Sequence, residues 1–252
     1  MALENYKVYR YRWVVLAVFM GVIAVNQLAW ITFAPITGVA AKYFGVSDLS
    51  IGLLSMSFMI VYIFVSIPAS WVIDTYGFQR AVSIGALLTG VFGMTRALAG
   101  DNYNLVLVSQ IGIAVGQPFI LNALTKVAAR WFPILERATA SGLGSLAMYL
   151  GIVIGMVLTP WLVLNYRINT MLVIYGISAV VAAGIFLVLA RERPPTPASP
   201  PGQEERSLVF DGLKQMMRMR DFLLLLVIFF IGLGVFNSVT TWIEDILRPR
   251  GF

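Results

Sequence analysis

Long apolar stretches, separated by short polar segments, dominate the hydropathy pattern of the chain. A helix that crosses the hydrocarbon core of a bilayer needs about 20 predominantly apolar residues. The stretches of this length are Trp13–Ala40, Ile51–Ile73, Ala81–Ala99, Tyr103–Ala128, Ala138–Leu164, Asn169–Ala190 and Phe222–Ile243. We therefore predict an all-α membrane protein with seven spans. The first stretch is too long for a signal-peptide core, so we interpret it as a retained helix.

The distribution of lysine and arginine predicts the orientation in the membrane. One side would carry the larger basic set, namely Lys7, Arg10, Arg12, Arg80, Lys126, Arg130, Arg137 and the basic residues of segment 191–220. The other side would carry Lys42, Arg167, Arg248 and Arg250. Because basic loops stay in the cytoplasm, we predict a cytoplasmic N-terminus and a location in the cell membrane, plasma or inner. The net charge of +6 then faces anionic lipid, and we expect no nucleic-acid partner.

Composition narrows the chemistry further. Hydrophobic residues make up 59% of the chain and charged residues 12%, with no cysteine and no histidine. The chain thus lacks the commonest general base, the commonest metal ligand and any thiolate. No pair of carboxylates falls at the centre of a predicted span. We therefore expect no catalytic site, metal or cofactor, and we predict that the protein is not an enzyme.

A change of composition divides the chain into three parts. Residues 1–190 hold six predicted spans joined by short loops, and we interpret them as an N-terminal transmembrane bundle. Residues 191–220 are rich in proline and charge, which is typical of a cytoplasmic interdomain linker, although a long loop is the simpler alternative. Within it, Leu208–Met219 has the pattern of a short amphipathic helix. Residues 221–252 hold the seventh span.

A weak internal repeat relates the first and fourth predicted spans. Ala24-Val25-Asn26-Gln27 in the first resembles Ala114-Val115-Gly116-Gln117 in the fourth, and similar aromatic-rich loops follow each at similar spacing. The two loops would lie on opposite sides of the membrane. Three spans followed by three inverted spans is the arrangement of many secondary transporters.

The segment between the second and third spans carries a more specific pattern. Residues 70–80 read SWVIDTYGFQR, which resembles the loop motif Gly-x-x-x-Asp-Arg-x-Gly-Arg-Arg of the major facilitator superfamily. Asp74 and Gly77 match, and Arg80 keeps one positive charge. The resemblance implies a gate in which Asp74 pairs with an adjacent arginine and a neighbouring helix N-terminus. It also implies the fold, a bundle of 3+3 inverted helices followed by a linker and one helix of a second half.

Glycines in the fifth span resemble that superfamily's fifth-helix motif. They are Gly142, Gly151 and Gly155. Small residues on one helix face allow another helix to approach closely. We expect these glycines to serve helix packing.

Within the superfamily, three segments resemble the feline leukaemia virus subgroup C receptor-related transporters. They are residues 54–77, 117–133 and 136–140, which include Gln117-Pro118-Phe119-Ile120-Leu121-Asn122. That family is implicated in moving choline, ethanolamine or haem. The resemblance implies an amine site that contains Asn26, Trp30 and Gln117. Asn237 stands where the family has a cage-completing tyrosine. One aromatic face for a quaternary ammonium group is therefore missing, which weakens the case for choline.

The physical character of these residues agrees with a binding site. Asn26 and Trp30 lie one turn apart, deep in an apolar span, and Gln117 precedes a proline that interrupts the helical hydrogen bonds. Tyr62 is a further candidate in the second span. The plain alternative is that the amides only join helices. We expect Arg96 to snorkel from the outer end of the third span, and the alternative is that it attracts an anionic substrate.

Two function classes remain open from the sequence. The first is a transporter of a small organic solute, a small amine or an organic anion, that works by alternating access. No carboxylate lies at the centre of a span, so facilitated diffusion is the simpler mechanism. The alternative is a seven-span receptor or scaffold that transports nothing. Because only one helix of a second half is present, alternating access would need either the protein's own missing C-terminal half or a second copy.

Overall fold

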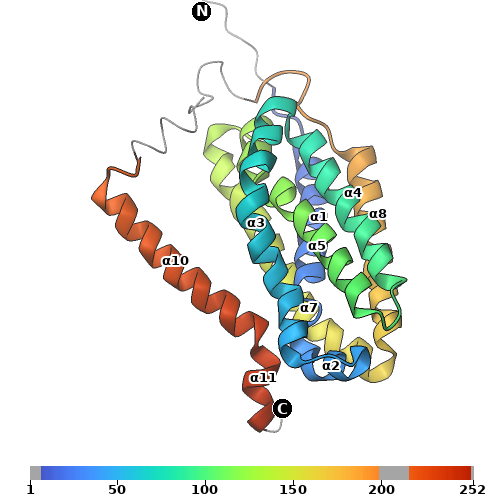
Figure 1. Cartoon of the computed structure of the whole chain (residues 1–252). Coiled ribbons are helices and arrows are strands. Elements are labelled where there is room, and N and C mark those ends of the chain that lie inside the picture. Colours follow the sequence, from blue (N-terminus) through green and yellow to red (C-terminus); the bar gives the residue numbers. More distant parts are fainter. Residues whose placement is uncertain (1–6, 199–215, 251–252) are drawn as a thin grey trace, which may run out of the picture.

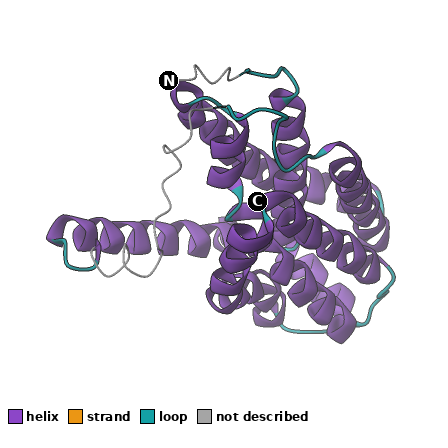
Figure 2. Cartoon of the chain, turned by 90° about the horizontal axis from the view of Figure 1, so that it is seen from above, coloured by secondary structure: helices purple, strands orange, loops and turns teal. Residues whose placement is uncertain are grey.

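The computed structural model describes residues 7–198 and 216–250, and all of its regular elements in these ranges are helical (Figure 2). In chain order the elements are α1 (Arg12–Ile31), η1 (Ala34–Ile36), α2 (Thr37–Phe44), α3 (Asp48–Tyr76), α4 (Phe78–Ala97), α5 (Tyr103–Leu121), α6 (Leu124–Trp131), α7 (Ile134–Asn165), α8 (Ile168–Leu189), α10 (Arg220–Thr241), α11 (Ile243–Leu247) and η2 (Arg248–Arg250). The all-α prediction is confirmed.

Local capping explains several helix ends. The side chain of Ser47 accepts a hydrogen bond from Ser50 N at the start of α3, and that of Asn102 does the same for Leu105 N at the start of α5. Such caps satisfy amide groups that have no partner inside the helix. Helix α2 ends at Gly45, whose φ of 67° lies in the left-handed region that glycine adopts without strain.

Six helical segments are long and apolar enough to cross a membrane, which is one fewer than the sequence predicted. All seven predicted stretches are helical, but α4 is not among the six. Helix α4 carries Gln79, Arg80 and Arg96 together with several glycines, which lower its mean hydropathy. It nevertheless runs alongside α5 and α8 within the bundle (Figure 1). Its length agrees with the prediction, and neighbouring helices bury polar side chains of α4, Arg96 among them.

Two of the predicted spans are broken. An interruption was expected at Pro118 in the fourth span, where the helix ends about one turn later, at Leu121, and none was expected in the first span. The span Trp13–Ala40 becomes α1, η1 and α2, and the span Tyr103–Ala128 becomes α5 and α6. Pro35 lies at the first break, and Pro118 lies one turn before the second. Proline lacks an amide hydrogen and disturbs the helix before it. Helices α3 and α7, in contrast, continue through Pro68 and Pro160.

The two breaks reveal the inverted repeat. In each copy a long helix is followed by an eight-residue helix, α1 by α2 and α5 by α6. Helix α2 lies at one end of the bundle, whereas the end of α6 lies beside the chain's N-terminal segment at the other, where Tyr11 and Trp131 are in ring contact (Figure 1). Helix α1 packs on α7 as α5 packs on α3, and α4 packs on α8. The predicted bundle of 3+3 inverted helices is confirmed.

Helix α10 stands apart from this bundle. It diverges from it at the end where the N-terminus lies and approaches it at the end where α2 lies (Figure 1). There α10 and α11 contact α3, η1 and α2. Along α10 only Thr240 and Thr241 are buried. Most of the linker predicted at 191–220, including residues 208–215 of the amphipathic segment, lies outside the described residues.

Candidate substrate site and gate

Asn26 and Trp30 lie on α1 and are both buried. Asn26 Nδ2 donates to Thr89 Oγ1 of α4 at 3.0 Å, and Trp30 Nε1 donates to the backbone carbonyl of Ser55 in α3 at 3.2 Å. The other amide atom of Asn26, Oδ1, is buried and has no hydrogen-bond partner within residues 7–198 and 216–250. The two side chains therefore bond to different neighbouring helices, and one buried acceptor remains unused.

Trp30 lies where four helices converge. Its buried cluster contains residues from α3, α5 and α7, namely Phe58, Ile113, Ala114 and Ile152. Gln117 follows Ile113 by about one turn on α5 and is only 4% exposed. Its amide makes no hydrogen bond with the part of the chain that the structure describes. The structure thus brings Trp30 and the α5 segment of Gln117 to the same central region of the bundle.

Tyr62 belongs to a separate polar group at the break between α5 and α6. Its hydroxyl donates to Asn122 Oδ1 at 2.5 Å. Asn122 Nδ2 in turn donates to Ser66 Oγ and Ser70 Oγ, both at 3.0 Å. These bonds fix the end of α5 to α3. Tyr62 therefore contacts Asn122, and no hydrogen bond between described residues joins it to Asn26, Trp30 or Gln117.

Asn237 lies on α10 and is partly buried. Next to it, Phe236 makes an edge contact with Tyr149 of α7, with ring centroids 6.3 Å apart. No hydrogen bond or ring contact among the described residues links Asn237 to the three candidates inside the bundle. The structure does not bring it together with them.

The surroundings of Arg96 differ from those that the sequence predicted. The expectation that it snorkels is wrong, because its side chain is fully buried. Nη1 donates to Gln110 Oε1 of α5 at 2.7 Å and to the Ala29 carbonyl of α1 at 3.0 Å, while Nη2 is 3.5 Å from Thr32 Oγ1. The guanidinium therefore lies at the end of α1 and receives no carboxylate partner from the described residues. An ionisable residue in an apolar span is the signal that predicts such burial.

The predicted gate residues lie at the junction of α3 and α4, and their partners differ from the prediction. Asp74 Oδ1 pairs with Lys126 Nζ of α6 at 2.8 Å. Arg80 is exposed and forms no ion pair with the residues that the structure describes. Instead of Asp74, Glu192 occupies the N-terminus of α4 and accepts a hydrogen bond from Gln79 N at 2.8 Å. Gly77 provides the turn with a φ of 89°, and a side chain there would collide with Glu192.

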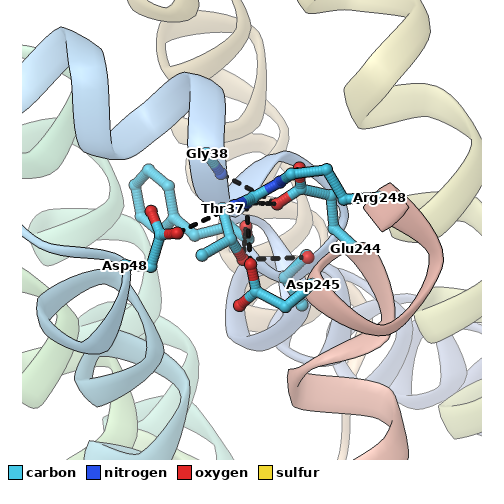
Figure 3. A network of polar contacts seen from close by, with 8 residues as sticks. Thr37, Gly38, Asp48, Glu244, Asp245 and Arg248 are labelled. Carbon is cyan, nitrogen blue, oxygen red and sulfur yellow. Dashed lines mark hydrogen bonds and ion pairs between the residues drawn. The ribbon is translucent and has the colours of Figure 1, made fainter. Parts of the chain in front are cut away.

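An ion network joins the helices at the opposite end (Figure 3). Arg248 bonds to Asp48 at the start of α3 at 2.9 Å, to Glu244 at 2.7 Å and to Asp245 at 2.7 Å. Glu244 also accepts from Gly38 N at the start of α2, at 2.8 Å. The hydrogen bonds that Arg248 donates to Glu244 and Asp48 raise its pKa. Burial raises the pKa of Asp245, although the charge of Arg248 opposes this. The sequence offered no signal for this network, because Asp48 and Arg248 are 200 positions apart.

The three glycines of α7 have different surroundings. A Cβ at Gly151 would lie 2.2 Å from the Ala24 carbonyl oxygen of α1, and one at Gly155 would lie 2.5 Å from Ile31 Cγ2. A Cβ at Gly142 would meet no atom within 4 Å. The close approach of α1 and α7 therefore involves Gly151 and Gly155 but not Gly142.

Comparison with known proteins identifies the family. A family model described as Major Facilitator Superfamily matches residues 19–251. The chain belongs to the major facilitator superfamily. Solute carrier family 49 member A3 of Danio rerio is 34% identical over all of this chain and 55% of its own length. The choline/ethanolamine transporter FLVCR1 of Felis catus is 31% identical over 94% of this chain and 45% of its own length. The expected resemblance to the feline leukaemia virus receptor-related group is confirmed.

A solved structure of a superfamily fold agrees with the arrangement of helices. The bacterial homologue of the human lysosomal transporter Spinster, in an inward-facing and unoccupied conformation, superposes with a TM-score of 0.76 at 19% identity. The match covers 96% of this chain and 56% of that one. The chain thus spans about half the length of the relatives it matches.

Proposed function

We propose that the chain supplies the first six-helix bundle and the seventh helix of a carrier that moves a small organic solute by alternating access. The observation that carries this proposal is the match of the whole chain to about half of proteins named as transporters. Members of this superfamily that transport have two bundles with a site between them, so this chain would contribute one side of the cleft. The second side would come from the rest of a longer polypeptide or from a second copy.

The arrangement of α10 supports alternating access. At one end Arg248 and Glu244 join α11 and η2 to α2 and α3, whereas α10 diverges from the bundle at the other end (Figure 1). If the N-terminus is cytoplasmic, as the basic loops predict, the closed end faces outward and the open end faces the cytoplasm. The Arg248 network would then have to open when the carrier turns outward.

A small amine is the substrate class that these residues favour. Several of the related proteins, FLVCR1 of Felis catus among them, are named choline/ethanolamine transporters. Trp30 offers an aromatic face for an ammonium group, and the free amide of Gln117 offers a hydrogen-bond partner. Asn26 would position this part of α1, and Asn237 would face the site from α10 once the second bundle is in place. An organic anion is less favoured, because the buried Arg96 already donates to Gln110 and Ala29.

Uptake measurements test the proposal. We expect cells whose membrane contains the protein to accumulate radiolabelled ethanolamine or choline faster than cells without it. Trp30→Ala and Gln117→Ala should raise KM by about tenfold each, the equivalent of about 1.4 kcal/mol of lost binding. Trp161→Ala, which removes an exposed tryptophan of α7, is the matched control and should leave KM unchanged. Saturable uptake that is insensitive to both variants would refute the site, and no uptake of any amine would favour a receptor or scaffold.

The intact mass of the purified protein and chemical crosslinking test where the second side of the cleft comes from. A mass far above 27.8 kDa would place both bundles on one polypeptide. A mass near that value, together with a crosslinked dimer, would support two copies. Either result leaves the amine site to be decided by the uptake experiment.

A further inference from the structure

A cavity of about 690 Å³ lies at the end of the bundle that holds the N-terminal segment, away from Trp30 and Gln117. Three segments that are distant in the sequence form it. They are the approach to α1 at Tyr9 and Tyr11, the end of α6 at Trp131, and the segment after α8 at Arg191, Arg193 and the two prolines that follow. None of these residues belongs to the transport site or to either ion network described above.

Hydrogen bonds between the three segments hold the walls in place. Trp131 Nε1 donates to the Arg191 carbonyl at 2.9 Å, and the Tyr11 hydroxyl donates to the Leu189 carbonyl at 2.8 Å. Thr196 Oγ1 donates to the Tyr9 hydroxyl at 3.3 Å. The rings of Tyr11 and Trp131 lie 6.0 Å apart. The cavity is therefore a built site rather than a gap between loosely placed loops.

The charge of this cavity is positive and is not neutralised by the residues that the structure describes. Arg191 and Arg193 line it and are exposed, and no aspartate or glutamate is among its lining residues. Glu192 stands between them in the sequence, but it points elsewhere and accepts from Gln79 N at the start of α4. The Arg191 guanidinium lies over the Tyr11 ring at 5.6 Å from its centroid, which holds it at the rim.

We propose that this cavity binds the phosphate group of an anionic phospholipid. Arginine pairs with phosphate oxygens through two parallel hydrogen bonds, and two arginines without acidic partners fit a phosphodiester. Tyr11 and Trp131 lie at the ends of membrane-spanning segments, at the level where lipid headgroups and interfacial aromatic residues meet. Basic residues at this level attract anionic lipid. The position of the cavity favours a lipid headgroup over a soluble phosphate compound as the source of this group.

Native mass spectrometry of the whole protein in detergent tests the proposal, with phosphatidylglycerol as the probe and phosphatidylcholine as the neutral reference. We expect Arg191→Gln/Arg193→Gln to weaken phosphatidylglycerol binding by about tenfold or more, the effect of losing charge-assisted hydrogen bonds. Arg191→Lys/Arg193→Lys keeps the charge but loses the paired geometry, and should also weaken binding. The matched control Arg80→Gln/Arg218→Gln removes two exposed arginines and should leave binding unchanged.

Three results would overturn the proposal. Equal weakening by the glutamine pair and the control pair would mean that only overall charge attracts the lipid. Full affinity in the lysine pair would mean that no defined phosphate site exists. Millimolar inorganic phosphate or glycerol 3-phosphate could displace phosphatidylglycerol while leaving bound phosphatidylcholine, the neutral reference, in place. That result would assign the cavity to a soluble anion.

Discussion

The α1–α7 and α3–α5 contacts both join the two copies of the inverted repeat and are equivalent under it, yet they are built differently. In the first, Gly151 and Gly155 let the backbone of α7 approach α1 closely. In the second, side chains bridge the helices: Asn122 bonds to Ser66 and Ser70, and the Tyr103 hydroxyl donates to the Ser50 carbonyl at 2.6 Å. One contact depends on the absence of side chains and the other on their polar atoms.

This difference shows that the repeat preserves the path of the backbone rather than the chemistry of the contacts. Inside a bilayer there is little hydrophobic drive between helices, so both close packing and interhelical hydrogen bonds can join them. A contact made by close packing is sensitive to added volume. A contact made by hydrogen bonds is sensitive to the loss of a polar group, because its partner is then left unpaired.

The largest loss in the free energy of unfolding should come from replacing Arg96, because its side chain bonds to both α1 and α5 and so connects the two contacts. Arg96→Ala removes the donors to Ala29 and Gln110 and leaves a void where the long side chain lay. We expect a loss of about 4 kcal/mol in the free energy of unfolding, measured by dodecyl sulfate titration. The control Arg167→Ala removes an exposed arginine at the start of α8 and should change the free energy of unfolding by less than about 0.5 kcal/mol. A stabilised Arg96→Ala protein would show that burying the guanidinium costs more than its bonds return.

The second-largest loss in the free energy of unfolding should come from adding a side chain in the α1–α7 contact, which tests its close packing. Gly151→Ala places a methyl group against the Ala24 carbonyl, so the helices must separate. We expect a loss of about 3 kcal/mol in the same titration. Gly142→Ala on the same helix meets open space and should be neutral or stabilising by up to about 1 kcal/mol, because alanine favours helix more than glycine does. Equal effects at both positions would contradict the close approach.

A smaller effect should follow from breaking the polar bridge of the α3–α5 contact. Asn122→Ala leaves Tyr62, Ser66 and Ser70 without their shared partner. The expected loss in the unfolding free energy is about 2 kcal/mol. Asn165→Ala, which removes an exposed amide at the end of α7, serves as the control and should have little effect. Should the two alanine variants behave alike, Asn122 would not be joining the helices.

The smallest loss of stability should come from removing the hydrogen bond at the other end of the α3–α5 contact. Tyr103→Phe removes only the hydroxyl that donates to Ser50, with a cost of about 1 kcal/mol. Tyr149→Phe, whose ring is exposed and whose hydroxyl makes no hydrogen bond within the described residues, should be silent. Thermal unfolding of both variants in one detergent, followed by tryptophan fluorescence, would detect the difference. Identical midpoints would indicate that Tyr103 contributes through its ring alone.

Much of the architecture was predictable because hydropathy and helix length respond to the same bilayer thickness. All seven stretches are helical, and the inverted repeat was visible in short matches around Asn26 and Gln117. The sequence predicted an interruption at Pro118 but none at Pro35, and α3 and α7 pass through prolines of their own without ending. Whether a proline ends a helix depends on the groups that surround it, and those come from other parts of the chain.

The sequence identified which residues deep in the spans are candidates for the site, but it did not predict how their side chains are arranged. Polarity within apolar spans identified Asn26, Trp30 and Gln117, and a family resemblance gave them a role. The direction in which each side chain points depends on its neighbours: Thr89 for Asn26, Ser55 for Trp30 and Asn122 for Tyr62. Arg96 was misjudged because its distance from the end of the helix was considered without Gln110, which meets it from α5.

Composition and span length are local properties, so the amino-acid sequence was enough to predict a helical membrane protein, and the motif at residues 70–80 indicated the superfamily. Which charges find partners depended on how the helices pack. It buried Arg96 among neutral acceptors, joined Lys126 to Asp74, and brought Arg248 to Asp48 across most of the chain. Ion pairs and buried polar contacts require two groups to meet in space, and helices that are distant in sequence meet only once the bundle has formed.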